Sequence, residues 1–334
     1  MKMTTMSIRK AFFAALGALP LALACLSAQA QAPYPSQPIK VLVGYASGGP
    51  LDTVARIVAQ GMSEALGQPV VVDNKPGASG LIATDLGKQA APDGYTIVFV
   101  PSTYVVNPIL MPKINYDPVK DFAPISHLAT LATVMISGPE ARFQSVRELV
   151  ALAKTGPGVV SYGSTGVGGP AHLSSELFQV QTGTQTTHIP FKGSAPALTE
   201  VMAGRVSYMF HPVTGLNQVV LAGKVKPLAV AGTAQRLADF PGVPTMAEAG
   251  YPGYEDVGVW FGIIAPVATP APIVTKLNAA VQTTLRRPAT QERLKAVGAV
   301  STGGTPQQFQ EFLSRDVARW TTIIRAAKIE LPNN

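Results

Sequence analysis

Two glycine-rich segments of this sequence follow apolar runs, and together they could bind a small anion through backbone groups. The first spans residues 47–53 and the second spans residues 163–169. Each pattern predicts a turn between a buried strand and the N-terminus of a helix. Helix N-termini carry unpaired N–H groups and a partial positive charge. Two such loops facing each other therefore predict an anion site that needs no buried Lys or Arg.

Asp52 lies in the first loop, where the predicted helix begins, and it has two interpretations. As a cap or first-turn acid it holds residues 48–51 in shape, and as a site residue it contacts the ligand itself. We favour the structural role, through which Asp52 still matters for the ligand without touching it. Arg56, one turn further on, is then the ion-pair partner of Asp52 or a surface group rather than a ligand clamp.

Ser164 lies in the second loop, within a Tyr-Gly-Ser-Thr-Gly sequence that invites comparison with the G-x-S-x-G nucleophile elbow of hydrolases. Tyr162 takes the place of the first glycine, so an exported serine hydrolase is only a remote alternative. Ser164 and Thr165 are instead expected to donate hydrogen bonds to a ligand or to cap the following helix.

Four other side chains near the predicted strand ends and helix starts have two interpretations each. His172 donates to an anion or is a satisfied structural imidazole. Lys192 follows the predicted strand 186–189 and contacts the ligand, or it is an ordinary solvated lysine. Tyr45 and Trp260 are core aromatics by default, although their places at strand ends leave room for stacking on a ligand.

The N-terminus predicts export. Residues 2–10 carry three basic side chains, residues 11–26 are apolar, and an A-x-A cleavage signal ends at Ala30. Cleavage there removes Cys25, the only cysteine, and so excludes cysteine catalysis and thiolate metal sites. The histidines lie on separate predicted elements without an H-E-x-x-H motif, so no metal site and no cofactor are expected. These histidines are His127, His172, His188 and His211.

The remaining composition bounds the class of protein. Cleavage removes three of the 26 basic residues and none of the 19 acidic ones, which lowers the formal net charge from +7 to +4. Without a Lys/Arg run or an aromatic-basic patch, nucleic-acid binding has little support. Cleavage leaves 304 residues, more than the roughly 250 at which a single core stops growing, so two domains are expected.

Strands and helices are predicted to alternate twice along the chain. In the first unit we expect strand 41–45, a helix ending at residue 66 with Gly67 as its C-cap, strand 70–72, a helix to about residue 90, and strand 95–100. In the second unit we expect strands 159–162, 186–189, 206–210 and 228–231, with helices 170–181, 194–203 and 213–222 between them. Both patterns favour parallel α/β units.

The connecting segments indicate that the chain leaves the first lobe and returns to it. Residues 101–124 hold five prolines and are predicted to be irregular, 125–136 form a crossing strand, and Ser145 with Glu148 caps a helix. Residues 236–254 form a linker and 260–266 a strand. A last helix opens at Thr305. Its apolar face is expected to pack on the first lobe, and it consists of Phe309, Phe312, Leu313, Val317, Trp320, Ile323 and Ile324.

A series of short motifs runs in order along nearly the whole mature chain. They are residues 48–56, 74–78, 92–96, 162–173, 190–193, 244–248 and 260–266. Together these motifs resemble the tripartite tricarboxylate transporter substrate-binding proteins, also called the Bug or TctC family.

The resemblance implies an α/β fold of the type II-like periplasmic binding proteins: two lobes, each a mainly parallel sheet flanked by helices, with the ligand cleft between them. The corresponding bounds are 1–30 for the signal peptide, 31–128 with 253–334 for domain I, 129–235 for domain II and 236–252 for the returning linker. It further implies a periplasmic monomer without catalysis, which delivers a small organic anion to a membrane permease.

The resemblance also implies that backbone amides and waters hold the ligand carboxylate. The positions carried over from the family motifs, together with the side chains singled out above, give one set of candidate ligand-binding residues. The set comprises Tyr45, Ser47, Gly49, Leu51, Asp52, Thr53, Ser102, Thr103, Gly163, Ser164, Thr165, Gly168, His172 and Lys192.

Two departures from the family pattern lie near the expected cleft. Ala46-Ser47 stands where the family often has a proline pair, and His211 where it often has Asp. Both leave open which carboxylate binds: an aliphatic di- or tricarboxylate, an amino acid, an aromatic acid or a nicotinate-like compound. A second hypothesis keeps the fold but makes the protein a periplasmic sensor that presents the bound acid to a membrane signalling partner.

Overall fold

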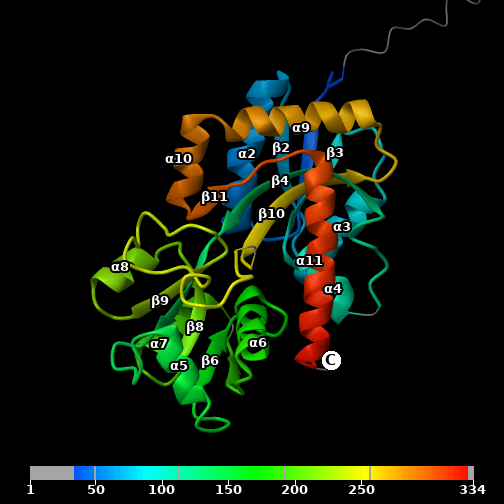
Figure 1. Cartoon of the computed structure of the whole chain (residues 1–334). Coiled ribbons are helices and arrows are strands. Elements are labelled where there is room, and N and C mark those ends of the chain that lie inside the picture. The colour runs from blue at the N-terminus through cyan, green and yellow to red at the C-terminus, as the bar shows by residue number, and fades with distance from the viewer. Residues whose placement is uncertain (1–33, 49, 112, 192, 256, 330–334) are drawn as a thin grey trace, which may run out of the picture. The chain divides into compact units, whose positions relative to one another are not determined.

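A computed structural model of the chain describes residues 34–48, 50–111, 113–191, 193–255 and 257–329. The predicted signal peptide, Gly49 and Lys192 lie outside these described residues. From Gln37 onward the chain forms one compact unit that holds two β-sheets with helices packed around them (Figure 1).

The six-stranded sheet has the strand order β11-β4-β10-β3-β1-β2. Its inner strands are rich in buried apolar residues on both faces, as expected for strands covered by helices on both sides, whereas the edge strands β2 and β11 are partly exposed. They are β1 (Ile39–Val43), β2 (Val70–Asn74), β3 (Thr96–Pro101), β4 (Phe122–Leu131), β10 (Val259–Pro266) and β11 (Ala299–Ser301). The helices of this half are α2 (Pro50–Leu66), the short η1 (Ala78–Gly80), α3 (Leu81–Lys88), α4 (Thr103–Leu110), α9 (Ala271–Leu285), α10 (Pro288–Ala296) and α11 (Pro306–Ala326).

The five-stranded sheet has the strand order β7-β6-β8-β5-β9. Its strands are β5 (Thr133–Ser137), β6 (Ser161–Ser164), β7 (Thr187–Pro190), β8 (Tyr208–Pro212) and β9 (Lys226–Ala231). Its helices are α5 (Val146–Ala153), α6 (Pro170–Thr182), α7 (Ser194–Met202) and α8 (Leu216–Leu221). The expected cap of α5 is present, because the Ser145 hydroxyl accepts a hydrogen bond from the Glu148 amide.

Both sheets are mixed, whereas the sequence predicts mainly parallel ones. Strand β1 is parallel to β2 and β3, and β6 is parallel to β7 and β8. Strand β10, which returns from the five-stranded half, runs antiparallel to both β3 and β4. Strand β5, which enters that half, runs antiparallel to β8 and β9. The antiparallel pairs thus arise from the strands that lead into and out of the crossings.

The predicted irregular segment 101–124 contains helix α4, so that prediction is wrong for residues 103–110. The sequence does not predict this helix because it contains Pro108. A proline inside a helix lacks the backbone N–H donor, so its presence usually argues against a helix. The carbonyl of Tyr104, four residues earlier, accepts the Tyr116 hydroxyl at 2.7 Å instead. The Tyr104 ring stacks on Tyr116 with their centroids 5.3 Å apart.

The crossing strand predicted over residues 125–136 is two strands, β4 and β5, that part at Ala132. The Ala132 carbonyl accepts the Val213 amide at 3.1 Å, so its backbone turns aside to the end of β8. Strand β4 belongs to the six-stranded sheet and β5 to the five-stranded one. This break is where the chain changes sheets.

Helix α11 carries the predicted apolar face, but it packs on more than the first half. Phe309, Phe312 and Leu313 are buried near its start, and Trp320, Ile323 and Ile324 near its end. The helix contacts β4 and α4 of the six-stranded half and α6 of the five-stranded half. A continuous apolar core therefore runs through both halves, and it includes Leu173 and Tyr254 beside Trp320.

Candidate site between the two sheets

The first predicted loop is shaped by Asp52, which is 3% exposed. One carboxylate oxygen accepts the Gly48 amide at 2.9 Å and the Arg56 Nε at 2.8 Å, and the other accepts the Asn74 amide at 2.9 Å. Burial alone would raise the pKa of Asp52, but these three hydrogen bonds hold that pKa below its ordinary value. The structural role of Asp52 and its pairing with Arg56 are confirmed.

Tyr45 joins this loop to the start of α4. Its hydroxyl lies 2.7 Å from the Thr103 Oγ1 and donates to the Ser79 carbonyl at 3.1 Å. The Asn107 side chain of α4 donates to the same carbonyl at 3.1 Å. Trp260, the other aromatic in question, is buried and donates from Nε1 to Asp316 at 2.8 Å, which confirms it as a core residue.

The second loop begins at Ser164, whose side chain is fully buried. The Ser164 Oγ lies 2.6 Å from the Nε2 of His188 on β7. It also accepts the Gly166 amide at 3.1 Å and donates to the Gly166 carbonyl at 3.2 Å. The buried hydroxyl therefore stabilises the turn of the loop. Thr165, the next residue, is exposed.

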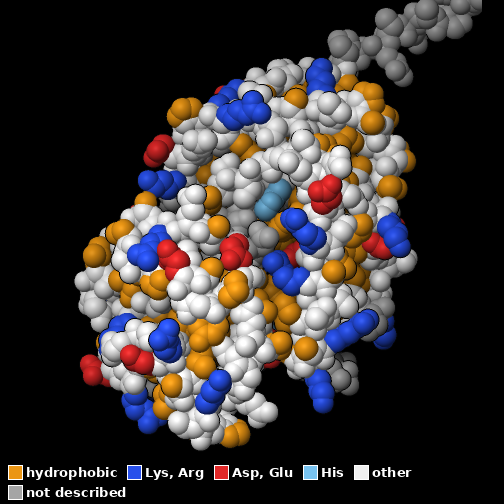
Figure 2. All heavy atoms as spheres, in the orientation of Figure 1, with side chains coloured by type: hydrophobic (Ala, Val, Ile, Leu, Met, Phe, Trp, Pro, Cys, Tyr) orange, Lys and Arg blue, Asp and Glu red, His pale blue; other side chains and the backbone are white. Residues whose placement is uncertain are grey.

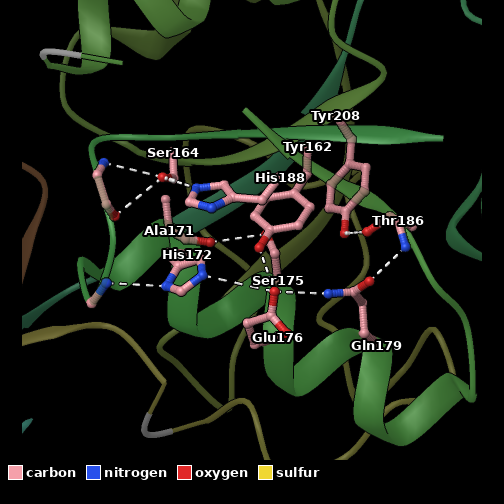
Figure 3. A network of polar contacts seen from close by, with 12 residues as sticks. Tyr162, Ser164, Ala171, His172, Ser175, Glu176, Gln179, Thr186, His188 and Tyr208 are labelled. Atoms are coloured by element: carbon pink, nitrogen blue, oxygen red, sulfur yellow. Dashed lines mark hydrogen bonds and ion pairs between the residues drawn. The ribbon is translucent and has the colours of Figure 1, made fainter. Parts of the chain in front are cut away.

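His172 holds the far end of the same loop (Figure 3). Its Nδ1 accepts the Gly168 amide at 3.0 Å, and its Nε2 lies 3.8 Å from the Glu176 carboxylate. Glu176 in turn accepts hydrogen bonds from the Tyr162 hydroxyl and from the Gln179 side chain. His172 is thus a satisfied structural imidazole, which is one of the two interpretations of the sequence.

Burial sets the protonation states of this group. It lowers the pKa of His172 to about 4, and the neighbouring His188 adds to that shift. Burial also lowers the pKa of His188 and raises that of Glu176, although the hydrogen bonds from Tyr162 and Gln179 favour the Glu176 carboxylate. Both imidazoles are therefore neutral near pH 7.

A pocket between the two sheets brings the helix starts of both halves together. Ser102 and Thr103 line it from the beginning of α4, and Gly168 and Pro170 line it from the beginning of α6. Trp320 of α11 and Gly258 before β10 complete its wall. The first-turn amides of a helix have no intrahelical partner, so two helix starts facing one pocket favour an anionic occupant.

Two backbone amides of the second loop remain available to a ligand. Gly166 and Gly168 donate to Ser164 and His172, whereas the amides of Thr165 and Val167, which lie between them, have no hydrogen-bond partner among the described residues. Neither Thr165 nor Val167 lines the pocket itself, which Gly168 of the same loop reaches, and no Lys or Arg is among the described residues that line it. The loop therefore offers an anion uncharged backbone N–H donors in place of a cationic side chain.

The predicted residues are brought together only in part. Ser102, Thr103 and Gly168 share the pocket, and Tyr45 adjoins it through Thr103. The described pocket wall does not include Ser47, Leu51, Asp52, Thr53, Gly163, Ser164, Thr165 or His172. Contact of these residues with a ligand stays a prediction.

His188 belongs to this site but is not among the residues predicted to bind the ligand. Its contact with Ser164 depends on the parallel pairing of β6 with β7, in which Ser164 lies opposite Pro190, two residues after His188. If β6 and β7 are predicted to be neighbours, a polar side chain near the end of β7 indicates a residue that can contact the loop after β6.

Another groove, of about 620 Å³, lies where α11 meets β4 and the chain crossings. His127 and Thr130 line it together with the charged side chains of Glu255, Glu311 and Arg315. Figure 2 shows a hollow on this face with acidic and basic side chains around it. It is lined by none of the predicted site residues.

Within the described part of the chain, no three or more His, Cys, Asp or Glu side chains are grouped so that they could hold a metal ion. Of the helices described, none combines the length and the apolar character needed to cross a membrane.

Comparison with known proteins gives consistent matches. The sequence model of the TctC family, described as "Tripartite tricarboxylate transporter family receptor", matches residues 54–329. Protein BugT of Bordetella pertussis (strain Tohama I) is 35% identical over 300 residues, which cover 89% of this chain and 91% of BugT.

Two solved structures match in fold and sequence. R. palustris Rpa4515 with adipate is 35% identical with a TM-score of 0.74, covering 89% of this chain and 99% of that one. MatC (Rpa3494) from Rhodopseudomonas palustris with bound malate is 32% identical with a TM-score of 0.71, covering 87% and 100%.

Proposed function

Because the chain belongs to the TctC family of tripartite tricarboxylate transporter receptors, we propose that it captures a small organic acid in the periplasm and delivers it to a membrane permease of that transporter type. Members of the family are solute-binding proteins and not enzymes, so the serine hydrolase alternative is set aside. The α/β fold with two sheets is the fold of such binding proteins.

The observation that carries the proposal is the shared pocket at the starts of α4 and α6. Ser102 and Thr103 face Gly168 there, across the boundary between the two sheets. The unpartnered amides of Thr165 and Val167, which lack a partner among the described residues, belong to the same loop as Gly168. A carboxylate bound at these groups gains hydrogen bonds and helix-dipole stabilisation without a salt bridge.

The ligand class follows from the site and from the relatives. Two structural neighbours hold adipate and malate, which are dicarboxylates. The pocket has a largely apolar wall with the hydroxyl groups of Ser102 and Thr103 at its edge, and its volume is about 10 Å³. That is about the space of one water molecule, so a ligand enters only if the two halves move apart, and a short aliphatic acid needs less movement than a large aromatic one.

The organisation that we propose for this function keeps the predicted bounds. Domain I comprises residues 31–128 and 253–334, domain II residues 129–235, and residues 236–252 return the chain. Cleavage near Ala30 releases the protein into the periplasm, where it acts as a monomer that closes on its ligand.

A thermal-shift panel of adipate, malate, citrate, benzoate and nicotinate tests the function. A ligand that binds only the folded protein raises the melting temperature, so we expect the aliphatic acids to raise it and adipamide, the neutral analogue of adipate, to leave it unchanged. A panel in which no acid raises the melting temperature contradicts the proposal.

A variant pair locates the site. Gly168 has a φ of +75°, and a Cβ there would lie 2.6 Å from the Leu110 Cδ1. Gly158 has nearly the same φ, +77°, but its Cβ would meet nothing closer than 3.8 Å. We expect Gly168→Ala to abolish the shift caused by the acids and Gly158→Ala, which carries the same backbone strain, to retain it. Equal shifts in both variants would place the ligand elsewhere.

A further inference from the structure

The five-residue loop 164–168 is held at two points by two imidazoles (Figure 3). The His188 Nε2 lies 2.6 Å from the Ser164 Oγ, at the start of the loop. The His172 Nδ1 accepts the Gly168 amide at 3.0 Å, at its end. His188 comes from β7 and His172 from α6, so the loop is fastened to two different elements.

The Gly168 contact assigns the tautomer of His172, and the tautomer of His188 follows from the proton of Ser164. When the Ser164 hydroxyl donates its single proton to the Gly166 carbonyl at 3.2 Å, it accepts from the Gly166 amide and from His188, which then carries its proton on Nε2. His172 accepts at Nδ1, so its own proton is on Nε2, the atom that lies 3.8 Å from Glu176.

The rings themselves form a stack that favours neutral imidazoles. His188 lies between Tyr162 and His172, with centroid distances of 4.8 Å and 4.3 Å. Two imidazolium cations at that spacing would repel each other, and burial lowers the pKa of both rings. The titratable groups packed around the pair are Glu176 of α6, Tyr162 of β6 and Tyr208 of β8.

The contacts of the loop with His172 and His188 determine which of its backbone amides can donate to a ligand. Gly166 and Gly168 donate inward, to Ser164 and His172. The alternate amides, those of Thr165 and Val167, have no partner among the described residues. A loop released from either imidazole would be free to turn these amides to its own carbonyl groups or to water.

We propose that His172 and His188 are positioning residues of the ligand site: as neutral rings they hold loop 164–168 in the conformation that presents the Thr165 and Val167 amides to a carboxylate. This inference rests on the proposed function. In this role each ring acts on the ligand through the loop.

Acid pH breaks one of the two attachments. A proton added at the His172 Nδ1 turns the acceptor of the Gly168 amide into a donor, and the hydrogen bond is lost. The pKa of His172 is about 4 in the folded protein, against an ordinary value near 6.5. The ring therefore stays neutral from pH 7 down to about pH 5, and the attachment is lost as the pH falls toward 4.

The test compares variants that keep the shape of the ring with variants that keep its hydrogen bond. Adipate is the probe, and calorimetry from pH 7 to pH 3.5 gives the affinity of each variant relative to that of the wild type at the same pH, because adipate itself takes up protons in this range. His172→Phe keeps a flat ring but removes the acceptor, and we expect about tenfold weaker adipate binding at pH 7. His172→Asn can place an amide oxygen near the position of Nδ1 and does not titrate. We expect it to bind adipate at pH 7 within about threefold of the wild type. Its affinity relative to the wild type should then rise as the pH falls through 4, because only the wild type loses the hydrogen bond to the Gly168 amide.

Two variants of His188, His188→Phe and His188→Gln, test the other contact of the loop in the same way. In His188→Gln an amide N–H replaces the Nε2 donor, and we expect it to restore most of the affinity lost in His188→Phe. A merely structural role for the rings would give equal losses in the phenylalanine and amide variants, and no change in the pH profile.

Amide hydrogen exchange of the ligand-free protein keeps this test separate from the proposed function. We expect the Gly168 amide to exchange much faster in His172→Phe than in His172→Asn or the wild type. Equal Gly168 exchange in all three proteins, or unchanged adipate binding in His172→Phe, overturns the inference. If the wild type binds no acid of the panel while the exchange pattern holds, the proposed function fails and the fastening of the loop stands.

Discussion

At the scale of single residues, Asp52 shows how one buried side chain can set the shape of a loop. Its carboxylate fixes the Gly48 amide from within the first turn of α2, and Arg56 and Asn74 complete its hydrogen bonds. The Asn74 amide also reaches the Tyr45 carbonyl at 3.0 Å. One carboxylate thus ties the first loop to its own helix and to β2.

Asp52→Asn is expected to lower the free energy of unfolding at pH 7 by about 1–3 kcal/mol, because charged hydrogen bonds to buried groups are replaced by neutral ones. Since the pKa of Asp52 is lowered on folding, its contribution is present above about pH 4 and is lost as the pH falls through the folded value. Urea unfolding at pH 7 and pH 3 should therefore show a smaller difference between variant and wild type at pH 3.

Asp73→Asn is the control for this substitution. Asp73 contacts Lys75 at 3.1 Å and Lys40 at 3.9 Å on the surface, and such exposed pairs contribute about 0–1 kcal/mol. If Asp73→Asn lowers the free energy of unfolding as much as Asp52→Asn does, the buried hydrogen bonds of Asp52 contribute no more to stability than an exposed ion pair.

At the scale of elements, α4 is the helix that places Ser102 and Thr103 at the pocket. Its interior Pro108 leaves the Tyr104 carbonyl without a helical donor, and the Tyr116 hydroxyl fills that place at 2.7 Å. Tyr104 in turn donates its own hydroxyl to the Pro118 carbonyl at 2.9 Å. The segment after α4 is therefore part of what stabilises the helix.

Tyr116→Phe is expected to lower the free energy of unfolding by about 1–3 kcal/mol, because it leaves a buried carbonyl unsatisfied. In a Pro108→Ala background the backbone at position 108 regains an N–H that can donate to the Tyr104 carbonyl, so Tyr116→Phe should then cost less than about 1 kcal/mol. A double-mutant cycle by urea unfolding measures the difference. Equal costs in both backgrounds would show that the Tyr116 hydroxyl does not substitute for the missing donor.

The sequence predicted the elements whose signals are local. The apolar runs of β1 and β3, the left-handed Gly67 after α2 and the start of α11 at Thr305 can each be recognised within a few residues. Helix α4 could not be predicted this way, because its proline is compensated by Tyr116, eight residues away. His188 could not be assigned either, because its contact with Ser164 requires knowing that β6 and β7 are neighbours.

At the scale of the whole molecule, three stretches of backbone cross between the sheets in close contact. A Cβ built on Gly258 would lie 2.8 Å from the Leu131 carbonyl oxygen and 3.2 Å from the Gly232 Cα. A Cβ on Gly232 would lie 3.3 Å from the Ala132 Cα. The chain crossings therefore pack backbone against backbone, and any movement of the halves about this point bends all three stretches together.

Gly258→Ala tests whether that packing matters for closing on a ligand. The added methyl group meets backbone that cannot move aside cheaply, so we expect the crossings to spread, the free energy of unfolding to fall by about 1–3 kcal/mol and adipate affinity to fall about tenfold. Small-angle scattering with adipate should show less compaction than in the wild type. Gly242→Ala is the matched control, because its Cβ would meet nothing within 4 Å, and it should change stability by less than about 0.5 kcal/mol. Full compaction and unchanged affinity in Gly258→Ala would mean that closure does not depend on how tightly the crossings pack.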